Sequence, residues 1–403
     1  DVYKRQELGT GNSDYSIAGG EIEASCQELY AQEKLLPHLD GSVKTAVQFN
    51  VSGLHNMQSQ FLPLLKKHLL HKRFDETARI DQLKEQHIQE VLTSIADLGY
   101  GFAKSASSRM FNNTGAYLDH VGGLCSLSFA FLMQKKAYSA LFTEALPSIY
   151  ASAFEKYIET VKNPTTNSRW ISTLEKDATS LDQPIDIREI QELTTAMQSE
   201  TSRNAFKQLT ESCEKALNGY DQWSRSFGFV IPSEVAFNAM SLYAPYSYED
   251  PRSAYTDLAA AMMSHLYLHT HIREKGGAYG SGCHFDIARS ALTFQSYRDP
   301  HVMKTFVHFE NAIEFLTSGN LQEQSLHEAK LKVLQSLDQP TPPSERAFRS
   351  DRWDQTGFSH NIRCQYKKTI LQASLQDITN MAQELQKSSQ IKGPQRMTRV
   401  SFA

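Results

Sequence analysis

Residues 271–280 read His-Ile-Arg-Glu-Lys-Gly-Gly-Ala-Tyr-Gly and join a predicted helix to a predicted strand. Upstream, Asp250-Pro251 is typical of a helix start, and apolar residues then recur at helical spacing as far as Gly276-Gly277. Downstream, residues 278–285 and 291–297 are predicted to form two strands. The alternation of helical and strand patterns indicates an α/β (α+β) fold.

Composition excludes several classes of protein. The chain has 403 residues, with 41 Lys+Arg against 45 Asp+Glu and a net charge of −4, so it lacks the basic surface of a nucleic-acid binder. No apolar run of about 18 residues is evident, so no membrane span is expected. The five cysteines are odd in number and form no C-x-x-C pair, which indicates reduced thiols in a non-oxidising compartment. The cysteine pattern does not identify the compartment, and the expected location is the cytoplasm of a bacterium.

The same plan occurs twice along the chain. The first copy contains a glycine pair, Gly19-Gly20, and expected strands at 16–29 and 43–51. Long helices are then expected at 54–68, 75–111 and 137–161. After a polar, mostly helical bridge at 163–222, residues 227–243 start the plan again with strands. Helices then continue to about residue 386, with Gly319 as one stop, and 399–402 is a last strand.

The first copy has only 18 residues before Gly19, whereas the second has strands and a full helix before its glycine pair. Residues 1–6, Asp-Val-Tyr-Lys-Arg-Gln, are interpreted as a translated sequencing-adapter remnant and excluded. We therefore expect a first domain at 7–215 that is truncated at its N-terminus, and a second at 216–403.

The glycine-rich stretch has two interpretations. A phosphate loop is rejected because the order here is helix, loop, strand, the reverse of what an anion site at a helix N-terminus requires. Gly276 and Lys275 fit a helix C-cap. Gly277, Gly280 and Gly282 would also let a second backbone approach, with Arg273 and Tyr279 offering hydrogen bonds to a peptide.

No complete catalytic centre is present in the sequence. His265 and His269 have the i, i+4 spacing of metal ligands, but no acid lies between them to act as a base, so packing histidines are favoured. Cys283 and His284 are neighbours in a strand and point to opposite faces, so they cannot form a nucleophile–base pair.

The stretch 271–280, followed by Phe-Gln-Ser-Tyr-Arg-Asp-Pro at 294–300, resembles the pitrilysin/insulinase family of zinc metallopeptidases, in its presequence-protease and falcilysin-like branch. The resemblance implies two bowl-shaped halves of two related domains each, built from mostly antiparallel sheets packed with helices. It implies that Zn²⁺ and the inverted motif His-x-x-Glu-His belong to the N-terminal half. This chain would be the C-terminal half and would hold no metal itself.

By that resemblance, Arg273 and Tyr279 map onto an arginine and a tyrosine that contact the substrate at the zinc. Gly277, Ala278, Gly280 and Ser281 would line the substrate. Zinc-activated water would attack the peptide carbonyl while Tyr279 donates toward the oxyanion and Arg273 holds a nearby carbonyl. A substrate peptide could also pair with a strand edge.

The implied function is the non-metal half of a zinc metalloendopeptidase that degrades unfolded peptides in a closed chamber. Its partners would be peptide substrates and the N-terminal half of the same polypeptide, with neither nucleic acid nor membrane. The chain alone is expected to be inactive. A non-catalytic scaffold or core subunit of the same fold, or a stand-alone peptide-binding module, are the alternatives. Ser281 and Arg298 rank lower as site residues, since Arg298 could pair within its own turn.

Overall fold

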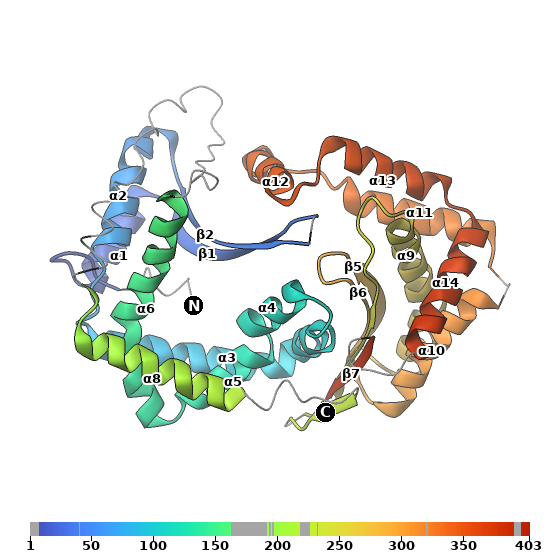
Figure 1. Ribbon diagram of the computed structural model, residues 1–403, viewed down its shortest axis with the longest axis horizontal. Coiled ribbons are helices and arrows are strands. Elements are labelled where there is room, and N and C mark those ends of the chain that lie inside the picture. Colours follow the sequence, from blue (N-terminus) through green and yellow to red (C-terminus); the bar gives the residue numbers. More distant parts are fainter. Residues whose placement is uncertain are drawn as a thin grey trace.

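The computed structural model describes residues 8–39, 41–162, 192, 195, 197–217, 226–231, 233–318, 321–390 and 396–403. In the first half, helix α1 is followed by a long hairpin and a set of helices (Figure 1). These elements are α1 (Tyr15–Ser25), β1 (Glu28–Pro37), β2 (Val43–Ser52), η2 (His55–Met57), α2 (Gln58–Leu70), α3 (Thr77–Ser108), α4 (Asn113–Gly122), α5 (Leu124–Met133), α6 (Lys136–Lys162) and α8 (Glu200–Leu217).

The second half carries most of the strands. Its elements are β3 (Ser226–Phe229), β4 (Ala236–Tyr243), α9 (Pro251–Met262), the π-helix η5 (Met263–Glu274), β5 (Gly280–Asp286), β6 (Ala291–Asp299), α10 (Met303–Thr317), α11 (Glu323–Leu337), α12 (Pro343–Thr356), α13 (His360–Gln372), α14 (Leu375–Gln390) and β7 (Met397–Phe402). The expected strands and helices of this half are therefore confirmed within a few residues.

The described strands form two sheets. A five-stranded sheet has the order β3-β7-β4-β6-β5, with only β3 and β7 parallel, and β1 pairs with β2 in a separate antiparallel hairpin. The α/β fold with mostly antiparallel pairing is thus confirmed. Helix, hairpin, helix occurs in both halves, as α1-β1-β2-α2 and as η5-β5-β6-α10.

Both faces of the five-stranded sheet are covered. Met240, Leu242 and Phe294 point into a large core shared with the helices of the second half. Phe237 and Phe402 point the other way, into a core whose helical side comes from α3 and α5 of the first half. Because alternate residues of a strand face opposite sides, β4 is buried along almost its whole length.

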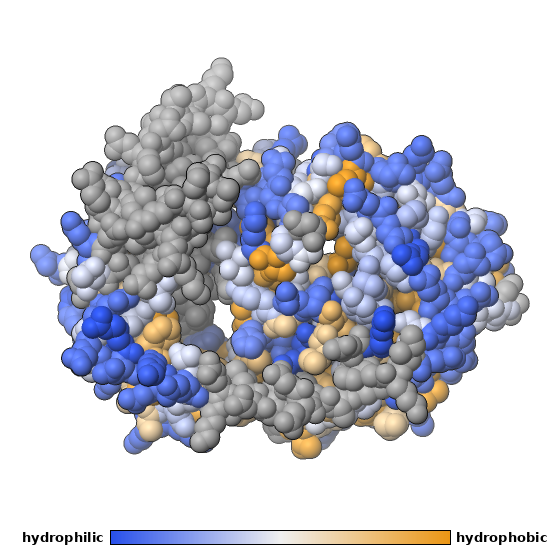
Figure 2. All heavy atoms as spheres, viewed as in Figure 1, coloured by the Kyte–Doolittle hydropathy of each residue, from blue (hydrophilic) through white to orange (hydrophobic). Residues whose placement is uncertain are grey.

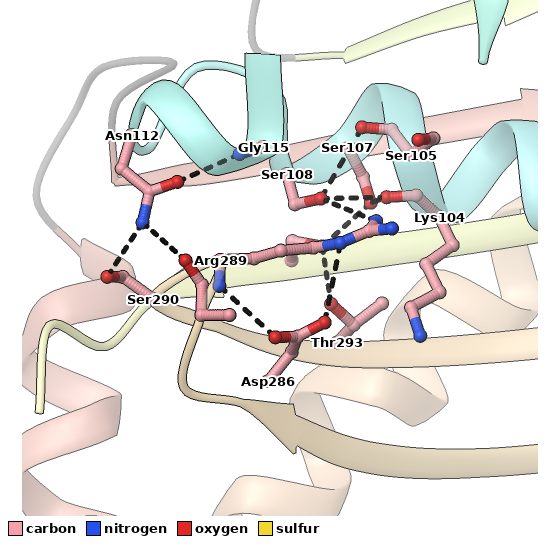
Figure 3. Close-up of polar contacts among 12 residues, drawn as sticks. Lys104, Ser105, Ser107, Ser108, Asn112, Gly115, Asp286, Arg289, Ser290 and Thr293 are labelled. Atoms are coloured by element: carbon pink, nitrogen blue, oxygen red, sulfur yellow. Dashed lines mark hydrogen bonds and ion pairs between the residues drawn. The ribbon is translucent and has the colours of Figure 1, made fainter. Parts of the chain in front are cut away.

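A polar seam joins the end of α3 to the β5–β6 turn (Figure 3). Asn112 Nδ2 donates to the Ser290 hydroxyl at 3.1 Å, and Arg289 Nη1 donates to the Ser108 hydroxyl at 3.4 Å. Arg289 also forms an ion pair with Asp286, at 3.3 Å between Nε and Oδ2. The seam therefore holds the two halves together next to the apolar core.

A second contact between the halves lies at the tip of the β1–β2 hairpin, which reaches α12 (Figure 1). The Leu39 amide donates to the Thr356 carbonyl at 3.1 Å, and Lys34 Nζ lies 6.0 Å from the centre of the Phe348 ring. On the face shown in Figure 2, the described residues present mostly hydrophilic side chains with scattered apolar ones.

Two sequence expectations are wrong. Residues 16–29 do not form one strand, because Asp14 caps a helix by accepting from the amides of Ser16 and Ile17; the strand begins only at Glu28. Gly19-Gly20 accordingly lies inside a helix. The expectation that no segment is long and apolar enough to cross a membrane also fails for Asn113–Met133. Here that segment is broken at Gly123, and its Leu124 packs in the core.

Some expectations fall on residues that lie outside the described ones. These are the interpretation of residues 1–6, Gly319 as a helix stop, and the part of the polar bridge at 163–191. The part of the bridge at Glu200–Leu217 is helical and forms α8. The division of the chain at residue 215 remains a prediction.

Candidate functional site

The Gly276-Gly277 turn follows a helix whose last part is a π-helix, which is wider than an α-helix. Asp250 caps α9, as expected, but after Met262 the helix continues as the π-helix η5. Its last turn closes when the Gly277 amide donates to the Arg273 carbonyl and the Ala278 amide donates to the Ile272 carbonyl, both at 3.1 Å. At 12 residues this π-helix is much longer than the usual single-turn π-bulge, and nothing in the sequence pattern indicated it.

Different local constraints favour glycine at the two positions of the Gly276-Gly277 turn. Gly277 has φ +79°, a conformation that side chains with a Cβ adopt only at a cost. A Cβ at Gly276 would lie 2.5 Å from the Ile272 carbonyl oxygen. The helix-cap interpretation is therefore confirmed, with Gly277 rather than Gly276 as the left-handed residue.

Arg273 and Tyr279 flank this turn, one on the last turn of η5 and the other just before β5. Both side chains are exposed, Tyr279 at 69%. Neither the Arg273 guanidinium nor the Tyr279 hydroxyl bonds to another side chain within the described ranges. The two groups are thus held at one end of the sheet with their donors unused.

The remaining predicted contact residues differ in their surroundings. Ala278 is buried. Ser281 donates from its hydroxyl to the Leu268 carbonyl at 3.1 Å, which ties β5 to η5. An added Cβ at Gly280 or Gly282 would meet its nearest atoms only at 3.8 and 3.9 Å, so packing inside the chain does not require either glycine.

β5 is the outermost strand of its sheet, but part of its outer edge is occupied. The Cys283 amide donates to the Ser264 hydroxyl at 2.8 Å, and that hydroxyl donates to the Cys283 carbonyl at 2.9 Å. A peptide could therefore not pair with β5 along its whole length. The unoccupied part lies toward Ser281 and Tyr279.

The strand next to β5 contains a bulge that the sequence did not reveal. The pairing of β4 with β6 shifts between Ala236 and Asn238, so one extra residue is accommodated before Asp299. Within the bulge Arg298 has φ +48°. Its guanidinium donates to Asp97 of α3 at 3.0 Å, so the ion pair reaches the other half instead of lying within its own turn.

The histidines near this site differ: His265 is exposed, which does not fit the expected packing role, whereas the other two have neighbours. His271 stacks on Tyr267 at 4.0 Å between ring centres, and His269 Nδ1 lies 3.4 Å from Glu274 Oε1. Among the described residues, no three His, Cys, Asp or Glu side chains are grouped so that they could hold a metal ion.

Cys283 and His284 do face opposite ways. Cys283 packs in the large core, and burial raises the pKa of its thiol well above the usual value. Burial together with the nearby Lys104 lowers the pKa of His284 to about 4. A buried neutral thiol is a poor nucleophile, so this pair offers no catalytic centre.

Two family models match the chain. Residues 227–400 match the PreP C-terminal domain, and residues 6–131 match a domain described as associated with subfamily C of the M16 peptidases. These matches define a chain of the M16 peptidase class. It belongs to the presequence-protease branch of that family, as the C-terminal part.

Curated relatives agree with this placement. The mitochondrial presequence protease of Kluyveromyces lactis is 25% identical over 96% of this chain and 38% of its own length. The one from Drosophila melanogaster is 27% identical over 75% and 27%, and the mouse protein 32% identical over 38% and 14%. The chain thus spans well under half of the relatives it matches.

Two solved structures show a partial likeness to this chain. A protease from Helicobacter pylori covers 99% of this chain, and the chain covers 87% of it, at 10% identity and a TM-score of 0.46. Pitrilysin covers 92% of this chain, which covers 35% of it, at 12% identity and a TM-score of 0.44.

Proposed function

We propose that this chain is the non-metal half of a zinc metalloendopeptidase that degrades unfolded peptides in a closed chamber. The observation that carries the proposal is Tyr279, an exposed aromatic residue whose backbone is fixed on both sides. The Ala278 amide before it closes the helix cap, and its own amide donates to the carbonyls of Tyr297 and Arg298 at 3.1 and 3.3 Å. A side chain with a fixed backbone, an exposed ring and a hydroxyl that bonds to no other side chain in the described structure is better suited to contact a ligand than to fill the core.

In this role Tyr279 donates its hydroxyl hydrogen toward the oxyanion that develops on the scissile carbonyl. Arg273 holds a neighbouring carbonyl of the peptide with its unused guanidinium donors. The open space at Gly280 allows the peptide backbone to lie close to the start of β5. Because Ser264 occupies the edge at Cys283, the peptide would leave β5 after a short contact.

The metal would be held by residues outside this chain, in the N-terminal half of the same polypeptide. The partners are thus peptide substrates and that half. The curated relatives are named as mitochondrial proteins, and a cytoplasmic location receives no support from them. We place the activity in a reducing compartment, in keeping with five free cysteines.

The test is Tyr279→Phe in a complete protease that contains this chain. We expect kcat on an unstructured peptide to fall by about 10²–10³ with an unchanged circular dichroism spectrum, since one oxyanion donor is lost. Tyr15→Phe is the matched control, because Tyr15 is also exposed but lies in α1. Wild-type turnover of Tyr279→Phe would contradict the proposal.

Peptide-binding and cleavage assays of the isolated chain distinguish the protease half from the alternative scaffold. We expect it to bind unstructured peptides without cleaving them. Cleavage by the purified, chelator-treated chain would contradict the assignment as a non-metal half. Failure to bind any peptide, together with normal turnover of Tyr279→Phe, would favour the scaffold.

A further inference from the structure

We infer that the kink of α3 positions Tyr279, through Asp97 and Tyr100 acting on the β6 bulge. These are positioning residues supplied by the first half of the chain to a group in the second. The inference rests on the proposed function of Tyr279 for its catalytic consequence, but not for its geometry.

The first step is the dependence of Tyr279 on the bulge. The Tyr279 amide donates to two successive carbonyls, those of Tyr297 and Arg298. The direction in which Tyr279 leaves the sheet therefore follows the local backbone of β6. Bulges commonly re-aim side chains next to active sites in this way.

The second step is that the bulge needs support. Arg298 has φ +48°, and the left-handed conformation is unfavourable for a residue that carries a Cβ. Two contacts of the same side chain favour it here. The guanidinium lies 5.4 Å from the centre of the Tyr297 ring and donates to Asp97 at 3.0 Å.

The third step is a row of rings that links Tyr279 to α3. The Tyr279 ring meets the Tyr297 ring edge to face, at 5.7 Å and 73°. Tyr297 in turn meets Tyr100 of α3 edge to face, at 5.6 Å and 89°, and it also packs on Phe237 at 5.6 Å. Edge-to-face pairs favour one relative orientation of the two rings, and this contribution adds to that of the apolar area they bury.

The fourth step is the kink, which lies between the two contact residues of α3. Leu98 has non-helical dihedral angles, φ −113° and ψ 15°. Gly99 follows it, and a Cβ there would lie 2.5 Å from the Phe237 ring. The kink and this close approach bring Asp97 and Tyr100 onto the bulge together.

Ordinary core packing predicts a different behaviour from positioning. If Tyr100 only fills space, its loss should lower stability and leave the Tyr279 ring and kcat unchanged. If it positions Tyr279, the ring should move even in folded protein. A displacement of about 1 Å at a catalytic group can lower turnover by up to about 100-fold.

The experiment incorporates 3-fluorotyrosine at position 279 of the whole chain and records its ¹⁹F resonance. Tyr100→Leu should shift or broaden that resonance, whereas Tyr100→Phe, which keeps the ring, should preserve it. Tyr138→Leu in α6 is the control, because Tyr138 is partly buried in another core cluster. In a complete protease containing the chain, Tyr100→Leu should lower kcat up to about 100-fold with KM unchanged.

An unchanged ¹⁹F resonance and an unchanged kcat in folded Tyr100→Leu would overturn the inference. If that variant does not fold, Asp97→Asn decides, since Asp97 is on the surface; an unaltered resonance there would also overturn it. A shifted resonance with normal turnover of Tyr279→Phe would instead sustain the positioning and reject the proposed function.

Discussion

Asp257 on α9 is a partly buried carboxyl group without a cationic partner among the described residues. Its Oδ2 accepts a hydrogen bond of 2.5 Å from the Tyr366 hydroxyl. Burial, with a smaller contribution from the charge of Asp286, raises the pKa of Asp257 to about 6 from the ordinary 3.8. The folded chain therefore binds more protons than the unfolded chain between these two pH values.

Stability attributable to Asp257 is consequently present below pH 4 and is lost as the pH rises through about 6. The full change is worth about 3 kcal/mol of unfolding free energy at about 1.4 kcal/mol per pKa unit. Asp257→Asn removes this dependence, because an amide does not ionise and can still accept from Tyr366. The variant should gain up to about 3 kcal/mol relative to wild type between pH 4 and pH 8.

The assay is urea unfolding of both proteins at pH 4, 5, 6, 7 and 8, followed by circular dichroism. The difference between variant and wild type cancels the titrations that both share. Asp354→Asn makes the same chemical change at an exposed position and should show a flat difference. An equally flat difference for Asp257→Asn would refute the reasoning, because the Asp257 carboxyl would then be no harder to ionise in the folded chain than in the unfolded chain.

Two further changes test the fold around the sites. Gly277→Ala should destabilise the chain by about 1–2 kcal/mol in urea unfolding, because φ is +79° there, whereas Gly280→Ala should be within about 0.5 kcal/mol; equal losses would contradict the assigned strain. His68 is buried with no hydrogen-bond partner for its ring in the described structure, and burial with Lys72 lowers its pKa to about 4. Stability is therefore lost as the pH falls from 6.5 toward 4, and His68→Leu should remove about 3 kcal/mol of that loss; an acid limb as steep in the variant would contradict it.

Local signals made the second half predictable. Asp250-Pro251, the Gly276-Gly277 turn and the alternating pattern of β6 each act over a few residues, and each element lies where they indicate. The same kind of signal is present at Asp14, which caps α1 at the start of the segment where a strand is predicted. At all of these positions, the interactions that decide the element lie within a few residues in sequence.

The supports of Tyr279 could not be predicted in that way. Asp97 and Arg298 are 201 residues apart in sequence, and neither has a neighbour that indicates the other. Tyr100 looks like any partly apolar position of a long helix, and only the fold places it against Tyr297. The glycine-rich stretch and the family resemblance both indicate Arg273 and Tyr279 as contact residues, whereas the support of Tyr279 by α3 is visible only in the tertiary structure.

Helix α3 belongs to the first half by sequence but to the core of the second half by packing. By chain order α3 belongs to the first half, yet its Phe102 and Ala106 complete the core under β4 and β7. Without that helix, Phe237 and Phe402 would be exposed on one face of the sheet, at about 25 cal/mol for each Å² of apolar surface left in water. The sheet that carries Tyr279 is thus stabilised by the same helix whose kink supports its bulge. Folding of the second half and placement of its candidate catalytic group are therefore set by one interface.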